Sequence, residues 1–275
     1  MGIRINTNIA SINTQRHLAN ATNAFAKSME KLSSGLRITR AGDDAAGLAI
    51  SESLKADIRA LNQASRNASD GISMLQTAEG AMDEVSNILQ RMKELAQQSL
   101  NGTNGPNERD LLNLEYAALV EEIDRIADST EFNGVKMLDG NGGTVGLQVG
   151  ITGTAQDRIN VDFNQSSRAA DLGITANITD VAGAQNAMTE IDAAIQNVVR
   201  VRAGWGAAQN RLESTIRNIS MTAENLSAAN SRIRDVDVAY ETSKMTSNQI
   251  LQQAGISMLS QANLVPGLAL SLLVS

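Results

Sequence analysis

The sequence predicts a mainly α-helical protein, a long antiparallel helical rod or coiled coil with a small β-hairpin region in the middle. Three observations predict this fold class. Apolar residues recur at alternating spacings of three and four over two long stretches, which is the pattern of a helical stripe. Only 2% of the 275 residues are aromatic although 42% are hydrophobic, so small aliphatic side chains and methionine must form helix-on-helix contacts. A Gly-rich segment with alternating apolar residues separates the two helical stretches.

The first long helix is predicted for about residues 44–100. Its apolar stripe consists of Leu54, Ile58, Leu61, Ala68, Ile72, Leu75, Met82, Val85, Leu89, Met92 and Leu95. At about 1.5 Å per residue this helix is roughly 80 Å long, which is far above the usual length in a globular protein. The segment NGTNGPN, residues 101–107, predicts a turn, and a second helix follows over about 107–129.

A β region is predicted for about residues 135–179. Short alternating runs at 145–149 and 158–163 indicate two strands that form a hairpin. The helical stripe then returns over about 180–235. Its members are Met188, Ile191, Ile195, Val198, Trp205, Leu212, Ile216, Ile219, Ala223, Leu226 and Ile233. We expect Gly204 and Gly206 to make room for the indole of Trp205, which would pack against the first long helix near Ile58 and Leu61 or Met82.

Each end of the chain predicts an amphipathic helix whose apolar stripe needs a partner. The stripe residues chosen as assembly positions are Ile5, Ile9, Ile12, Leu18, Phe25, Leu32, Leu251, Met258, Val265 and Leu272. A single pair of such ends buries little area against about 1–2 kcal/mol of backbone entropy per ordered residue. We therefore expect the two ends to pair loosely in the monomer and to order fully when identical chains stack. Such a contact is heterologous, so it grows a filament.

The composition excludes several kinds of site. The chain has no Cys and one His, so thiolate chemistry and zinc sites of the usual type are excluded, and we expect no catalytic, cofactor or metal site. The loop at Asp139 begins like a calcium loop but has Gly150 where a bidentate Glu is needed. The net charge of −7 argues against a nucleic-acid partner. The longest apolar run is too short to insert in a membrane, and the first residues lack the pattern of a secretory signal.

Residues 35–44 predict a linker between the end helix and the first long helix. Gly35 and Gly42 would break the helix, and Asp43 or Asp44 would cap the next one. A paired-carboxylate site at the two aspartates is the alternative, but neighbouring helical positions point about 100° apart. The linker residues are Gly35, Arg40, Gly42, Asp43 and Asp44.

Several motifs resemble those of a known family. The stretches are SSGLRITRAGDDAAGLAISESL at 33–54, TEFNGVKML at 130–138 and NLSAANSRIRDVDVAYET at 225–242. In this order, and with the closing residues 261–273, they closely resemble bacterial flagellins. The chain is similar to a short member of the family without the large variable outer domains.

The resemblance implies a structural subunit of the flagellar filament that serves swimming motility and is exported unfolded by the flagellar type III apparatus. It implies an inner-tube domain of residues 1–42 with 236–275 and an outer rod domain of 43–235 with a solvent-facing hairpin. The partners it implies are copies of the chain, an export chaperone, the filament cap and hook-associated proteins. The location it implies is an extracellular flagellum, with a periplasmic or sheathed filament left open. It also implies that the vertebrate Toll-like receptor for flagellin recognises Arg91, Leu95 and Glu115.

Three other functions are alternatives to this one. A hook–filament junction protein shares the terminal helices, but the full motif series favours a flagellin. A secreted enzyme would need catalytic residues in the middle segment, which holds no His or Cys. A generic coiled-coil scaffold would have no need of its two terminal helices for assembly.

Overall fold

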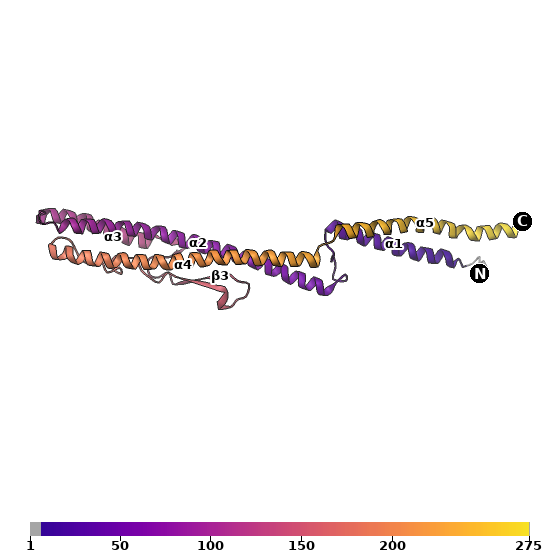
Figure 1. Cartoon of the computed structure of the whole chain (residues 1–275), viewed down its shortest axis with the longest axis horizontal. Helices are drawn as coiled ribbons and strands as arrows, with labels where there is room; N and C mark the ends of the chain where they lie inside the picture. Colours follow the sequence, from indigo (N-terminus) through magenta and orange to yellow (C-terminus); the bar gives the residue numbers. More distant parts are fainter. Residues whose placement is uncertain (1–6, 275) are drawn as a thin grey trace. The chain divides into compact units, whose positions relative to one another are not determined.

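The protein divides into two compact units in a computed structural model, which describes residues 7–274. One unit comprises Met1–Ala56 with Asn225–Ser275, and the other comprises Asp57–Glu224. The described residues form five long α-helices and two small antiparallel sheets of two strands each (Figure 1). The predicted fold class is confirmed. The units divide inside two of the long helices and not at the linker, because polar contacts described below tie residues 51–52 to residues 230–234.

The terminal unit is built on α1 (Ile9–Ser34) and α5 (Val238–Val274), which run side by side (Figure 1). Helix α1 begins at the N-cap Asn8, whose side chain accepts a hydrogen bond of 3.0 Å from the backbone N–H of Ser11. It ends at Gly35, which has a φ of 71° and so adopts the left-handed conformation that glycine permits. Local sequence therefore fixes both ends of α1.

The second unit contains most of α2 (Ala45–Ser99) and α4 (Val181–Arg234) and all of α3 (Pro106–Ser129). Pro106 occupies the first turn of α3, where its missing N–H costs nothing. The predicted stripes supply most of the buried apolar side chains of α2 and α4. Fully buried apolar side chains include Leu75, Met82, Val85, Leu89, Met92, Leu95, Ile123, Ile191 and Leu212.

The β region forms two hairpins. The first, β1 (Glu131–Phe132) with β2 (Val135–Lys136), turns at Asn133 and Gly134, both with positive φ as the tightest hairpin turn requires. The second pairs β3 (Thr144–Gln148) with β4 (Arg158–Asp162), and a short 3₁₀ turn, Ala155–Asp157, precedes β4. Val161 and Ile159 on β4 are buried, whereas the alternate residues are exposed, so this hairpin packs on one face and meets solvent on the other.

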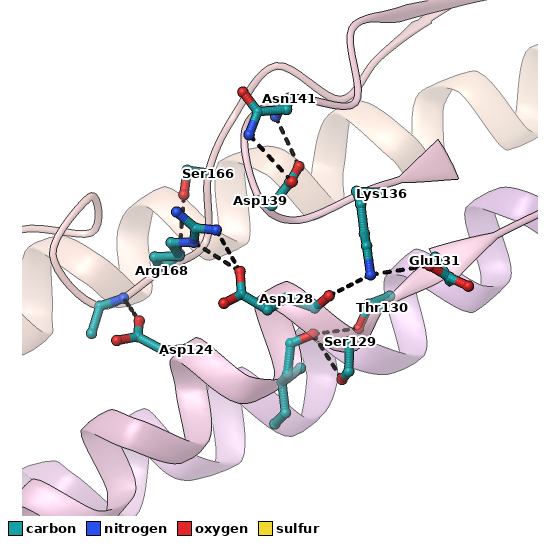
Figure 2. A network of polar contacts seen from close by, with 12 residues as sticks. Asp124, Asp128, Ser129, Thr130, Glu131, Lys136, Asp139, Asn141, Ser166 and Arg168 are labelled. Carbon is teal, nitrogen blue, oxygen red and sulfur yellow. Dashed lines mark hydrogen bonds and ion pairs between the residues drawn. The ribbon is translucent and has the colours of Figure 1, made fainter. Parts of the chain in front are cut away.

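Polar contacts fasten the irregular chain after β4 onto the end of α3. Arg168 forms an ion pair of 2.6 Å with Asp128, and the carboxylate of Asp124 accepts the backbone N–H of Ala169 at 2.8 Å (Figure 2). Lys136 bonds both the carbonyl oxygen of Asp128 and the carboxylate of Glu131 (Figure 2). The segment between β4 and α4 is therefore a packed part of this unit.

Trp205 is buried, 5% exposed, and an aromatic neighbour that the sequence did not predict lies beside it. Its ring lies 5.7 Å from that of Phe163, at the end of the second hairpin, and its indole N–H faces the carbonyl oxygen of Asp162 at 3.4 Å. A Cβ added at Gly204 or Gly206 would meet no atom within 4 Å outside its own chain neighbours, of which Trp205 is one. That these glycines make room for the indole stays a prediction.

Gly142 is expected to be intolerant of substitution. A Cβ there would lie 2.3 Å from the carbonyl oxygen of Lys136 and 2.8 Å from the Cβ of Phe163, so Gly142→Ala should lower the free energy of unfolding by about 1–3 kcal/mol. Gly204→Ala is the matched control and should raise it by up to about 1 kcal/mol, because the helix position is open. Urea unfolding measures both, and equal values for the two variants would contradict the close approach at Gly142.

Candidate assembly surfaces

The contact between α1 and α5 is polar where it is most deeply buried. The hydroxyl of Ser28 donates a 2.6 Å hydrogen bond to the carboxylate of Glu241, and both side chains are buried. Nearer the other end of the pair, the hydroxyl of Ser11 donates to the amide oxygen of Asn263 at 2.8 Å. Because buried polar groups without partners are costly, these bonds fix the register of the two helices.

Large apolar side chains of the same two helices remain exposed to solvent. In the described part of α1 and α5 no apolar side chain is buried. More than half of each of the following is exposed: Ile9, Ile12, Val238, Tyr240, Ile250, Leu251, Ile256, Met258 and Leu264. This is the reverse of an ordinary domain, and contiguous exposed apolar surface is typical of an interaction site.

The structure places the predicted assembly residues in three groups. Ile9, Ile12, Leu251 and Met258 are exposed. Leu18, Phe25 and Leu32 are half-buried, and Leu18 lies close to Gly255 of α5. Ile5 and the side chains of Val265 and Leu272 lie outside the described residues. The role of Ser28 and Glu241 in holding the pair together was not predicted, because a polar residue within an amphipathic helix indicates the solvent face.

A groove of about 440 Å³ runs between the two helices. Its lining residues are His17, Leu18, Asn20, Ala21, Ala24, Asn248, Leu251 and Gly255. A Cβ at Gly255 would lie 3.3 Å from Cδ1 of Leu18, so glycine lets the helices approach closely there. The amide nitrogen of Asn248 is buried and makes no hydrogen bond to the described residues. The groove is thus a hollow with an apolar wall and one unused donor.

The two aspartates of the linker accept hydrogen bonds from different parts of the chain. Asp44 caps α2, because its carboxylate accepts the N–H of Gly47 at 2.8 Å. Asp43 instead accepts from the hydroxyl of Thr39 at 3.0 Å and from backbone N–H groups upstream, and the bond from Thr39 lowers the pKa of Asp43. Arg40 forms an ion pair with Glu30 of α1. Gly35 closes α1, whereas Gly42 has an ordinary φ and open space around it.

A second set of contacts joins the linker to the end of α4. The backbone N–H of Arg37 donates to the carbonyl oxygen of Arg234 at 2.6 Å, and that of Val236 donates to Gly35 at 3.0 Å. The guanidinium of Arg234 pairs with Glu52, which lowers the pKa of that carboxyl. Sequence reasoning missed Arg234, although a basic residue in the last turn of a helix is a known signal for such a role.

The three residues of the predicted receptor patch lie on α2 and α3. Arg91 is half-exposed and bonds Glu115 at 2.9 Å and Glu94 at 3.0 Å. Leu95, in contrast, is 1% exposed and belongs to the core. Arg91 and Glu115 therefore form a surface ion pair, and Leu95 lies inside the unit.

The described residues contain neither a membrane-spanning helix nor a metal-binding cluster. No helix in that part of the chain has the length and apolar character needed to cross a bilayer. Within the same residues, no group of three His, Asp or Glu side chains is placed to hold a metal ion.

Comparison with known proteins identifies the two ends of the chain. Residues 5–142 match the bacterial flagellin N-terminal helical region, and residues 188–273 match the bacterial flagellin C-terminal helical region. A flagellin from Halalkalibacterium halodurans is 52% identical, over 98% of this chain and 99% of the relative. The flagellar filament 33 kDa core protein of Treponema phagedenis is 44% identical, over 98% and 99%.

Among solved structures, the crystal structure of Bacillus cereus flagellin matches with a TM-score of 0.51 and 35% identity, over 60% of this chain and 94% of that one. The flagellin of Bacillus subtilis is 46% identical, over 98% of this chain and 100% of the relative. Because both helical regions of the family occur in order and the relatives match along almost their whole length, this chain belongs to the bacterial flagellin family and is a structural protein, not an enzyme.

Proposed function

We propose that this flagellin polymerises into the flagellar filament through α1 and α5, whose exposed apolar side chains are covered by neighbouring copies. One observation carries the proposal: the α1–α5 contact buries serine and glutamate and leaves isoleucine, leucine and methionine in solvent. Fully burying one such side chain contributes about 1.5–3 kcal/mol. Several of them together offset the cost of association, which is about 4–15 kcal/mol.

Other partners are proposed from the same surface and from the family. An export chaperone would cover the apolar side chains of the terminal helices before assembly, and the filament cap and hook-associated proteins would meet the same helices at the filament ends. The filament would be extracellular, free or sheathed, or would lie in the periplasm, and it would drive swimming. In each case the exposed stripe of α1 and α5 is the part of the chain that supports the contact.

Deletion of either terminal helix tests the assembly proposal. Chains lacking residues 1–34 or 238–275 should stay monomeric on filament seeds, whereas the full chain grows into filaments that sediment and are visible by electron microscopy. Because the unit Asp57–Glu224 has its own core, its cooperative thermal transition should persist in both deletions, and this is the control for folding. Filament growth by either deletion would overturn the proposal.

Recognition of the monomer by the vertebrate Toll-like receptor for flagellin is a second proposal. The exposed ion pair of Arg91 with Glu115 supports it, because the pair holds a guanidinium in a fixed position on the surface. Leu95 would act from the core by keeping α2 in place. The resemblance to flagellins motivates the choice of these residues.

Arg91→Ala monomer is expected to lose at least tenfold in potency in a receptor reporter assay. Arg125→Ala is the matched control, because Arg125 is also an exposed arginine paired with a glutamate, Glu122, on the neighbouring helix α3. An unchanged response to Arg91→Ala, or an equal loss in both variants, would contradict the proposed role of the pair.

A further inference from the structure

Most of the described methionines fall into two classes that differ sharply in access to solvent, and Met188 and Met245 are intermediate. Met82, Met92 and Met137 are completely buried, and Met74 is nearly so. Met29, Met221 and Met258 are at least half exposed, with Met221 at 65% and Met258 at 60%. A small oxidant in solution would therefore reach the second class first in the free chain.

Met258 differs from Met221 in its position. It follows Leu251 by seven residues, or about two helical turns, so both side chains lie on the same strip of α5. Leu251 lines the groove between α1 and α5, and both residues are exposed. Met258 thus extends the apolar wall of that groove, whereas Met221 lies on α4 in the other compact unit.

We propose that Met258 is a modification site at which peroxide oxidation of the free monomer blocks filament growth. This inference rests on the proposed function, because it assumes that a neighbouring copy covers the strip of Leu251 and Met258. The peroxide transfers one oxygen atom to Sδ as its O–O bond breaks. The thioether is oxidised by two electrons to a sulfoxide, and the peroxide is reduced to water.

The sulfoxide changes the chemistry of the strip. An apolar thioether gains a strongly polar S–O group, which is hydrated in the monomer but must lose that water when a second copy covers it. Leu251, two turns away on the same strip, is apolar and offers the sulfoxide no donor in compensation. Once the filament has formed, the covered Met258 is out of reach of the oxidant, so the block acts on the monomer only.

Full-chain monomer treated with hydrogen peroxide tests the inference. Peptide mass spectrometry follows sulfoxide at Met258, and seeded polymerisation follows growth. We expect the growth rate of oxidised wild type to fall at least tenfold. Oxidised Met258→Leu should grow within twofold of its untreated form, whereas oxidised Met221→Leu, the matched control, should fall as wild type does. Treatment with methionine sulfoxide reductases should restore growth.

Oxidation of preformed filaments separates this inference from the proposed function. We expect sulfoxide at Met258 to form at least tenfold more slowly in filaments than in monomers. If Met258 is protected but oxidised monomer grows normally, or if oxidised Met258→Leu fails as wild type does, the inference is overturned and the assembly proposal stands. Equal rates of oxidation at Met258 in monomers and in filaments would overturn both the inference and the assembly proposal. If untreated Met258→Leu grows poorly, seeded polymerisation of Met258→Gln is the deciding measurement. Normal growth of this polar variant would overturn the inference.

Discussion

Leu251→Asp should abolish filament growth without destabilising the monomer. The side chain is 56% exposed on α5, so the new carboxylate stays hydrated in the free chain and the free energy of unfolding should change by less than about 0.5 kcal/mol. In a filament the same carboxylate would be covered without a partner, at a cost of several kcal/mol. Since about 1.4 kcal/mol corresponds to a factor of ten, the critical concentration should rise more than a hundredfold.

Sedimentation of filaments at increasing protein concentration measures this change, and urea unfolding checks the monomer. Ile151→Asp is the matched control, because Ile151 is also an exposed aliphatic side chain but lies in the loop between β3 and β4. Its critical concentration should stay within twofold of wild type. Normal growth of Leu251→Asp would show that α5 meets no other copy at this position.

Phe163→Ala should cause a large loss of stability in the unit Asp57–Glu224. Phe163 is among the largest fully buried side chains and packs against Trp205 at 5.7 Å between ring centroids. Truncation leaves a cavity, and buried Phe→Ala changes cost about 3–5 kcal/mol. Urea unfolding should show this loss, and the fluorescence of Trp205 should shift to longer wavelength because the indole gains contact with water.

Phe25→Ala is the control of the same chemistry. Phe25 is only half-buried on α1, in the terminal unit, so its loss should cost less and leave the emission of Trp205 unchanged. An emission spectrum of Phe163→Ala identical to that of wild type would contradict the packing of the two rings.

The long helices were predictable because their signals are local. Spacings of three and four mark α2 and α4, and Gly105 with Pro106 marks the start of α3. The turn at Asn133 and Gly134 carries an equally local hairpin signal, yet the predicted β region began one residue beyond it and missed the first hairpin.

The packing of the segment after β4 depends on partners far along the chain. Glu190 of α4 accepts the backbone N–H groups of Thr175 and Ala176, and Asn113 of α3 accepts that of Ile178. No periodicity within residues 163–180 signals such bonds. The same limit applies to Trp205, whose aromatic neighbour Phe163 follows a hairpin strand and is not signalled by the apolar stripe of α4.

The apolar stripes of the terminal helices could be predicted from the sequence. Their exposure to solvent in the monomer could not. An apolar stripe in a sequence shows that a helix has a partner, and it does not distinguish a partner in the same chain from one in another copy. Here Ser28 and Glu241 form the buried contact between the two helices, and much of the apolar stripe stays exposed to solvent. Only the burial of each side chain separates the two cases.

That leftover apolar surface has a thermal consequence. Burial of apolar surface lowers the heat capacity of a protein, and in an ordinary domain this happens on folding. In the terminal unit most of it would happen on polymerisation, so filament growth should show a negative heat-capacity change while the paired monomer helices contribute little. Hydrophobic attraction weakens on cooling. The filament should therefore loosen in the cold before its subunits do, and growth should be driven by entropy near room temperature.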